Sequence, residues 1–277
     1  MKKNILKTIL ASAILPFALA SLSSCSYYWR VNDSMEGDTL KAALRLTIDH
    51  TTPINYEDVA KHYPKTDADP EKARHIILFY TGQSVSTLMT DYDYHPYGAG
   101  DNDINREHVW PQSRFRIYGA LGDNAEKYGK AENPGPATDL YNVRPALGAV
   151  NTSRSNYFYG EDMDTLYDPY TSTEGGQKEF RGEIARIIFY CATRYEKLEL
   201  TDDYADPTSN IKTYKMGRVS ELLKWNLEEA VNEREIVRND EVEKIQGNRN
   251  PFVDHPEYAC RIWGRFNDAT KSVCGYK

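Results

Sequence analysis

The chain has 277 residues, of which 40% are hydrophobic and 27% charged, and its formal net charge is −7. This composition is ordinary for a globular protein and excludes a disordered or fibrous chain. No apolar run after residue 25 approaches the roughly 20 residues of a membrane-spanning helix, which excludes a polytopic membrane protein.

The first 24 residues have the pattern of an export signal. A basic start precedes an apolar stretch from Thr8 to Leu19, and small residues follow it. The ending Leu22-Ser23-Ser24-Cys25 resembles a bacterial lipoprotein signal, in which Cys25 becomes the lipidated first residue; an ordinary signal with an incidental cysteine is the alternative. We therefore expect an exported protein that is either lipid-anchored in the outer membrane, on its periplasmic or cell-surface side, or secreted. Because residues 1–24 hold three lysines and no acidic residue, their removal leaves a net charge of −10.

The first half of the mature chain mixes one helical pattern with strand and loop patterns. We expect residues 25–37 to be a tether. Asp38 then opens a helical pattern with four apolar residues on one face: Leu40, Ala43, Leu44 and Ile48. The apolar run from Ile76 to Tyr80, followed by Gly82, predicts a buried strand. Residues 92–105 predict a loop, and residues 115–138 a surface excursion, because both are rich in Gly, Asn, Asp or Pro.

The second half predicts helices. Apolar residues between Phe180 and Cys191 recur at helical spacing and predict a strong amphipathic helix. Further helical patterns carry Val219, Leu222 and Leu223, then Ile236, Val237, Val242 and Ile245, and a short helix from Pro256 to Gly264 ends the series. Without a repeat or a linker, residues 38–277 predict one helix-rich α+β domain.

Three cysteines besides Cys25 remain after the signal. Cys191 lies on an apolar helix face and is expected in the core. Export brings a protein into oxidising conditions, so we expect a disulfide between Cys260 and Cys274, with two free thiols as the alternative. No CxxC spacing is present, which argues against a cysteine-based zinc site.

Glu107 and His108 are the first candidates for chemistry. Neighbours on a regular strand face opposite sides, so both reach one site only if the strand ends or bends there. Pro111 favours such an ending. The alternative is a buried structural histidine beside an exposed glutamate. The pair is not part of an HExxH motif, so a zincin protease is not indicated.

A second polar group follows some forty residues later. A helix beginning near Val150 would place Asn151, Arg154 and Ser155 on one face. Asn151 offers a neutral oxygen to a hard cation beside a carboxylate, and Arg154 a bidentate fork to a phosphate. The alternative is a polar loop with capping side chains. Both groups lie in residues 105–160, which hold seven basic and five acidic residues, so we expect an electropositive trough for an anionic substrate.

Four ordered blocks of the chain resemble the bacterial endonuclease I family of periplasmic and secreted nucleases. They are Asn105-Arg106-Glu107-His108-Val109-Trp110-Pro111-Gln112-Ser113; Asp139 to Pro145 with Val150 to Asn156; Arg181 to Arg186 with Tyr190 and Arg194-Tyr195; and Gln246 to Pro256. The resemblance runs, in order, from about residue 76 to about residue 264. Four blocks in order are far more specific than any single motif.

The resemblance implies a ββα-metal, or His-Me finger, site. His108 would be the general base, Glu107 and Asn151 would hold one Mg²⁺, with Mn²⁺ or Ca²⁺ as alternatives, and Arg144 or Arg154 would neutralise the scissile phosphate. The candidates for substrate binding are Arg106, Ser155 and Asn156. The implied activity is hydrolysis of DNA, with RNA as an alternative substrate, with little sequence specificity and with 5′-phosphate ends. No protein partner is implied.

Two other functions stay open on the sequence alone. One is a lipid-anchored binding protein with an inactive nuclease-like site, against which the intact Glu107, His108 and Asn151 argue. The other is a surface glycan hydrolase, which the abundant aromatics and carboxylates would suit. A glycan hydrolase needs two carboxylates about 5–10 Å apart, which a sequence does not show.

Overall fold

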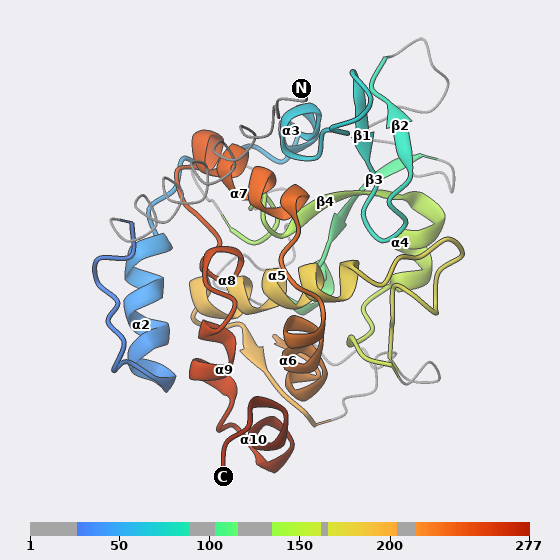
Figure 1. The fold of residues 1–277 in the computed structure, drawn as a ribbon. Helices are drawn as coiled ribbons and strands as arrows, with labels where there is room; N and C mark the ends of the chain where they lie inside the picture. Colours follow the sequence, from blue (N-terminus) through green and yellow to red (C-terminus); the bar gives the residue numbers. More distant parts are fainter. Residues whose placement is uncertain (1–26, 89–102, 116–134, 162–165, 204–213) are drawn as a thin grey trace, which may run out of the picture.

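The structure is a computed structural model that describes residues 27–88, 103–115, 135–161, 166–203 and 214–277 (Figure 1). Helix α5 (Phe180–Arg194) crosses the middle of the molecule, with α2 (Gly37–Ile48) at one side and the β3–β4 pair and α4 (Gly148–Arg154) toward the other. The described part of the chain contains helices and three two-stranded sheets, so the prediction of a helix-rich α+β domain is confirmed. No helix within these described ranges is long and apolar enough to cross a membrane.

The other elements complete the domain around α5. In chain order they are α3 (Val59–Thr66), β1 (His75–Ile77), β2 (Ser84–Ser86), β3 (Ile104–His108), η1 (Gln112–Arg114), β4 (Val143–Leu147), β5 (Glu199–Leu200), β6 (Lys215–Met216), α6 (Val219–Glu228), α7 (Glu233–Gln246), α8 (Pro251–Asp254), α9 (Tyr258–Trp263) and α10 (Asp268–Cys274). The helix predicted from Asp38 is confirmed as α2, which buries the four predicted apolar residues. The predicted strand before Gly82 is confirmed as the shorter β1.

Helix α5 is buried on all sides, whereas the sequence predicted an amphipathic helix. Every one of its residues is buried, including its four charged side chains. These charges are tolerated because each has a buried partner: Arg186 pairs with Glu235, for example, at 2.5 Å. Local periodicity cannot show such partners, which come from distant parts of the chain.

Helix α7 lies where the sequence predicted it, but it presents a different face to the core. Ile236 and Val237 are 48% and 52% exposed, although both were expected to be buried. The buried face instead carries polar residues such as Glu235 and Arg238. Arg238 Nε donates to Asp67 Oδ1 at 3.1 Å, so an ion pair with the end of α3 decides which face turns inward.

Strands β3 and β4 and helix α4 form a ββα unit. The strands are antiparallel, and Glu107 lies opposite Arg144 in their register. Strand β3 ends at His108, three residues before Pro111, as the sequence predicted. Helix α4 follows β4 directly and begins beside the start of β3, since Leu147 pairs with Ile104; its last residue, Arg154, lies 3.2 Å from Glu107 near the end of β3.

The described part of the expected tether, residues 27–36, packs on the domain. Tyr28 is buried and its hydroxyl donates to Asp254 Oδ2 at 2.5 Å. The Tyr27 hydroxyl accepts from the backbone N–H of Arg249 at 3.0 Å. Farther along, Arg261 Nη2 donates to the carbonyl of Met35 at 2.7 Å. This segment is therefore part of the folded domain rather than a free linker.

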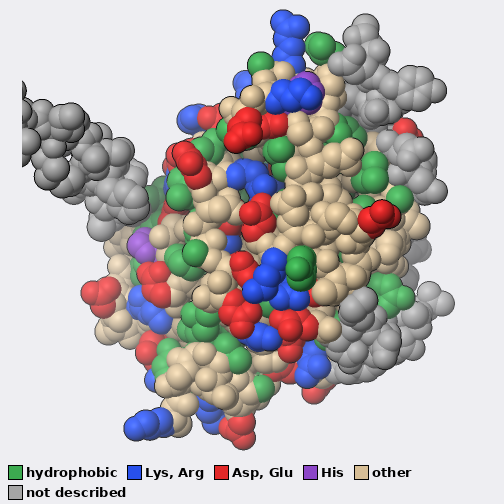
Figure 2. Space-filling model, turned by 45° about the vertical axis from the view of Figure 1, so that its right-hand side comes forward, with side chains coloured by type: hydrophobic (Ala, Val, Ile, Leu, Met, Phe, Trp, Pro, Cys, Tyr) green, Lys and Arg blue, Asp and Glu red, His purple; other side chains and the backbone are tan. Residues whose placement is uncertain are grey.

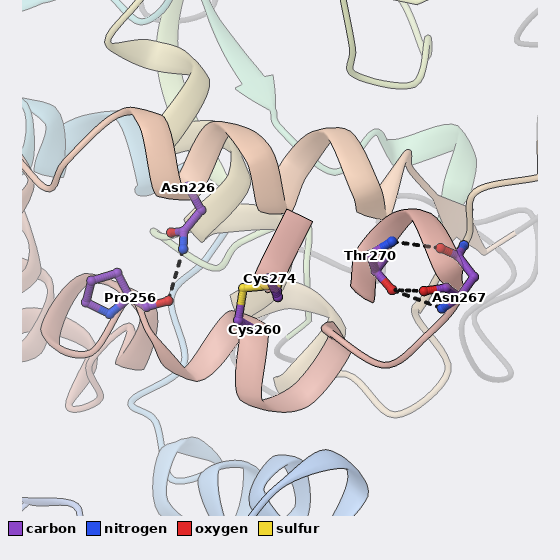
Figure 3. The surroundings of a disulfide bond; sticks show 6 residues. All are labelled: Asn226, Pro256, Cys260, Asn267, Thr270 and Cys274. Carbon is purple, nitrogen blue, oxygen red and sulfur yellow. Dashed lines mark hydrogen bonds between the residues drawn. A yellow bond between two sulfur atoms is a disulfide. The ribbon is translucent and has the colours of Figure 1, made fainter. Parts of the chain in front are cut away.

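A disulfide closes the C-terminal end of the chain (Figure 3). Cys260 on α9 and Cys274 on α10 are bridged, which confirms the prediction, and Cys191 is a buried free thiol in the core as expected. Asn267 caps α10: its side chain accepts from the Thr270 N–H at 2.9 Å. The bridge and the cap together fix α10 against the body of the domain.

The predicted surface excursion at residues 115–138 is only partly described, since residues 116–134 lie outside the described ranges. Its last part, residues 135–138, is buried rather than at the surface. The loop predicted at residues 92–105 lies mostly outside the described ranges as well, and β3 already begins at Ile104. The burial of residues 135–138 matters because Ala137 contacts His108.

Candidate functional site

A hollow of about 550 Å³ opens between the end of β3 and the C-terminal half of α4. It is lined by Tyr56, Arg106, Glu107, His108, Pro111, Gln112, Ser113, Asn151, Thr152, Ser155 and Asn156. Six of these residues are the predicted base, both predicted metal ligands and all three predicted substrate-binding residues. The ββα unit therefore brings together two segments of the chain that are some forty residues apart.

His108 is held in one orientation. Its Nε2 lies 3.0 Å from the carbonyl oxygen of Ala137. A carbonyl can only accept, so Nε2 carries the proton and Nδ1 keeps a lone pair. The Gln112 amide nitrogen lies 3.4 Å from that Nδ1. Burial lowers the pKa of His108 from its usual 6.5 to about 4, so the imidazole is neutral and able to accept a proton at neutral pH.

Glu107 is nearly fully buried, and Tyr80 and Arg154 contact its carboxylate. Tyr80 donates its hydroxyl proton to Oε1 at 2.6 Å, and Arg154 Nε lies 3.2 Å from the same oxygen. Burial raises the pKa of Glu107 to about 7, although Arg154 and Tyr80 act in the opposite direction. The carboxylate thus sits in a place where a positive charge from the hollow would stabilise it.

The remaining predicted contacts come mainly from α4 and the residues after it. Asn151 is half-buried on the helix, and Ser155 is exposed just past its end. Asn156 donates from Nδ2 to Ser113 Oγ at 3.2 Å, which joins the two sides of the hollow. Arg106 donates from Nη1 to the Tyr56 carbonyl at 2.9 Å, and its guanidinium lies 3.8 Å from the centre of the Tyr56 ring.

The structure places both predicted phosphate-binding arginines in the interior. Arg154 is 0% exposed and does not line the hollow. All three of its guanidinium nitrogens donate to neighbours: Nε to the Tyr159 hydroxyl at 2.9 Å, Nη1 to the Ser155 carbonyl at 2.7 Å and Nη2 to the Val109 carbonyl at 2.7 Å. Because these donors are engaged, Arg154 contacts Glu107 on the side away from the hollow and is not placed to bind a phosphate there.

Arg144 is likewise turned inward. Its Nε donates to Asp67 Oδ1 at 2.9 Å, and its Nη1 pairs with Glu183. Its guanidinium also lies 4.3 Å from the centre of the Phe79 ring. Two carboxylates therefore neutralise this side chain, which does not line the hollow, and the expectation that it contacts the scissile phosphate needs correction.

Among the described residues, fewer basic side chains line the hollow than the residue counts indicated. Arg116, Lys127 and Lys130 lie outside the described ranges. Four basic residues of residues 105–160 are described, and of these Arg106 lines the hollow. The other three, Arg114, Arg144 and Arg154, are buried. Arg114 donates to the backbone carbonyl of Asn156 at 2.8 Å. On the face drawn in Figure 2, basic and acidic side chains are interspersed and form no large basic patch.

Four residues around the site were not predicted. Tyr56, which precedes α3, stacks on His108 with ring centres 6.0 Å apart, and Gln112 donates to the Tyr56 hydroxyl at 3.3 Å. Tyr80 and Tyr159 lie behind Glu107, with their hydroxyl oxygens 2.9 Å apart. Gln112 lies inside a block that resembles the family, but no local pattern singles out any of the tyrosines.

The geometry suits a hydrolytic reaction on an anionic substrate. A neutral imidazole with a lone pair on Nδ1 can take a proton from water. The Glu107 carboxylate and the Asn151 amide are oxygen donors of the kind that hard divalent cations prefer. The described lining of the hollow contains one carboxylate, so the pair that a glycan hydrolase needs is not found there.

Comparison with known proteins supports the same interpretation. Residues 36–257 match the family described as Endonuclease I. The chain is 35% identical over 251 residues to an extracellular ribonuclease of Bacillus subtilis (strain 168), covering 85% of this chain and 78% of that protein. It is 24% identical over 190 residues to an extracellular deoxyribonuclease of Aeromonas hydrophila, covering 63% of this chain and 77% of the relative.

The family match covers most of the chain and includes every residue that lines the hollow. The named relatives are nucleases, and this agrees with a histidine beside a carboxylate on a ββα unit. The predictions of an endonuclease and of a His-Me finger fold are confirmed. The chain belongs to the endonuclease I family.

Proposed function

We propose that the protein is an exported, metal-dependent endonuclease that hydrolyses phosphodiester bonds with His108 as the general base. One observation carries the proposal: His108, Glu107 and Asn151 line the same hollow, and the Nδ1 of His108 is left as a proton acceptor. In this reaction Nδ1 takes a proton from water as the water oxygen attacks phosphorus. The bond from phosphorus to the 3′ oxygen breaks, and this oxygen takes a proton from solvent, so the products are a 5′-phosphate and a 3′-hydroxyl. The protonated His108 then returns its proton to solvent.

Glu107 and Asn151 are the proposed ligands of one divalent cation, Mg²⁺ in the first instance. Among the described residues there is no group of three or more His, Cys, Asp or Glu that could hold a metal. A site with one carboxylate and one amide oxygen suits Mg²⁺, which keeps several waters and completes its shell with substrate phosphate oxygens. When bound, the cation supplies charge stabilisation for the phosphate and the leaving oxygen.

The proposed substrates are DNA and RNA, with little sequence preference. Both polymers are proposed because the relatives include an extracellular ribonuclease and an extracellular deoxyribonuclease. Arg106, Ser155 and Asn156 offer polar groups of the kind that contact phosphate and sugar, and such contacts carry no sequence information directly. Cleavage rates of DNA and RNA measured at equal enzyme concentration show which polymer is cut faster.

The test is plasmid nicking and RNA cleavage by purified variants across a Mg²⁺ titration, with metal affinity measured in parallel. His108→Ala should keep Mg²⁺ and nucleic-acid binding but lose about 10²–10⁴-fold in turnover. Glu107→Ala should weaken metal binding, and high Mg²⁺ should restore part of the activity. His50→Ala is the matched control, because His50 is exposed and does not line the hollow. Cleavage by His108→Ala at the parent rate would refute the assignment of the base.

The same assays separate the proposed enzyme from an inactive binding protein. EDTA should abolish cleavage by the parent protein, and Mg²⁺ added in excess should restore it. A parent protein that binds nucleic acid but cuts neither polymer at any Mg²⁺ concentration would instead be a binding protein.

We also propose that Cys25 carries a lipid that anchors the protein in the membrane. Cys25 lies outside the described residues, but Tyr27 and Tyr28, which follow closely, are hydrogen-bonded to the domain. A lipid on Cys25 would therefore hold the domain close to the bilayer. Cys25→Ala should abolish labelling by a radioactive fatty acid and move the protein from the membrane fraction to the soluble fraction; an unchanged membrane fraction would refute the anchor.

A further inference from the structure

We infer that Tyr80 is a positioning residue for the Glu107 carboxylate, one that holds this carboxylate in the orientation that metal binding needs. The inference rests on the proposed function, since it concerns the same site. Tyr80 does not line the hollow. It acts through Glu107 alone.

The contact between the two side chains is short and shielded from water. The Tyr80 hydroxyl lies 2.6 Å from Glu107 Oε1, and both residues are buried. An ionised carboxylate can only accept, so the hydroxyl is the donor, and such a charge-assisted hydrogen bond is stronger than a neutral one. Because Glu107 also lines the hollow, the bond fixes one oxygen of a carboxylate that faces the substrate side.

A chain of hydrogen bonds leads from Arg154 to Glu107. Arg154 Nε donates to the Tyr159 hydroxyl at 2.9 Å, and the hydroxyls of Tyr159 and Tyr80 are 2.9 Å apart. The single proton of Tyr159 can go to Tyr80 or to the Val109 carbonyl, 3.0 Å away. That carbonyl accepts from Arg154 and has a second lone pair for Tyr159, so in either arrangement the Tyr80 proton stays available for Glu107. Tyr80 then donates to Glu107.

The backbone at Tyr80 supports a functional constraint. Its φ is +74°, in the left-handed region that residues with a side chain rarely adopt. Neighbouring segments hold it there: the Gln177 N–H donates to the Tyr80 carbonyl at 3.0 Å, and the Phe79 N–H donates to the Pro145 carbonyl at 2.7 Å. Strained residues of this kind persist where the surrounding structure over-determines them, and they cluster at functional sites.

A supporting side chain of this kind has a measurable effect on metal affinity. Groups that hydrogen-bond a metal ligand fix its orientation, and their removal costs 10–100-fold in metal affinity or activity. Tyr80→Phe removes the hydroxyl and keeps the ring, which packs edgewise on Tyr167 with centres 5.5 Å apart. We therefore expect about a 10–100-fold weaker affinity for Mn²⁺ or Mg²⁺, with the fold retained.

The experiment measures metal binding directly on the full mature chain without nucleic acid. Mn²⁺ binding is followed by electron paramagnetic resonance and Mg²⁺ binding by competition, while the melting temperature reports on folding. Tyr167→Phe is the matched control: it also removes a buried tyrosine hydroxyl of the same aromatic group, but that hydroxyl bonds Thr173 at 2.5 Å and not Glu107. The control should leave metal affinity unchanged.

A second comparison separates positioning from general stability. In a Glu107→Gln background the ligand charge is already lost, so adding Tyr80→Phe should weaken Mn²⁺ binding much less than it does in the parent. Equal effects in both backgrounds, or an unchanged affinity in the single Tyr80→Phe variant, would overturn the inference. If Glu107→Gln itself leaves metal binding intact, the proposed function of Glu107 fails instead, and the two failures are told apart.

Discussion

Arg154→Met tests whether this arginine supports Glu107 or contacts the substrate. The substitution keeps much of the buried volume but removes the charge beside Glu107, whose Oε1 lies 3.2 Å from Arg154 Nε. Both side chains are nearly fully buried. Removing one partner of a buried pair typically costs about 3–5 kcal/mol, because the other charge is left without compensation.

In a domain of this size, that loss corresponds to a fall in melting temperature of about 6–20 °C, since 1 kcal/mol shifts the melting temperature by about 2–4 °C. The assay is thermal unfolding followed by circular dichroism at neutral pH. Arg106→Ala is the matched control, because Arg106 lines the hollow and is half-buried. We expect it to cost less than Arg154→Met, about 1–2 kcal/mol, because its hydrogen bond to the Tyr56 carbonyl and its contact with the Tyr56 ring are partly exposed.

A double variant sharpens this test. If Arg154 compensates the charge of Glu107, then Glu107→Gln combined with Arg154→Met should be less destabilised than the sum of the two single changes, by about 0.5–3 kcal/mol. An Arg154→Met variant that melts with the parent and fails only in cleavage would refute the supporting role. Such a result would support a direct contact between Arg154 and the substrate phosphate.

Three further predictions concern pH, the disulfide and salt. Burial opposes ionisation of Glu183, but Arg144 outweighs it and holds the pKa of Glu183 at about 2, below the unfolded value of about 4.3. The loss of unfolding free energy caused by Glu183→Gln should therefore be largest above about pH 5 and become smaller as the pH falls toward 2. Urea titrations measure this loss, and a loss that does not change with pH would contradict the prediction. The double variant Cys260→Ser, Cys274→Ser opens a loop with a sequence separation of 14 and should lower the free energy of unfolding by about 3 kcal/mol. Urea titrations at neutral pH measure this loss, and an unchanged midpoint would show that the bridge adds no stability. Arg106→Ala should lower the slope of log affinity against log salt for DNA by about one, measured by fluorescence anisotropy, and an unchanged slope would exclude a phosphate contact.

The parts of the fold that the sequence predicted well are those encoded by local periodicity. Helix α2 buries Leu40, Ala43, Leu44 and Ile48 because their spacing places them on one side of a helix. Helix α7 shows where this reasoning fails, since Ile236 is exposed on it and Arg238 is buried. The orientation of α7 depends on ion pairs with partners distant in sequence, which no local pattern records.

The candidate site shows the same division. Glu107, His108 and Asn151 were predicted from their residue types and from blocks that resemble a family, and the structure brings them to one hollow. Arg144 and Arg154 were predicted from a block that resembles the family and, for Arg154, from its place on one helix face with Asn151. Whether an arginine faces a substrate or a buried carboxylate is a tertiary property, and here both face inward.

The end of β3 explains how two neighbouring side chains serve one site. Glu107 and His108 leave the strand in opposite directions, so each needs its own support. The imidazole is fixed by the Ala137 carbonyl at 3.0 Å, whereas the carboxylate is fixed by Tyr80 at 2.6 Å. Arg154 joins the two sides, because it lies beside Glu107 and also donates to the carbonyl of Val109, the residue directly after His108. A change at Arg154 should therefore disturb the positions of both the proposed base and the proposed metal ligand, although this arginine does not reach the hollow.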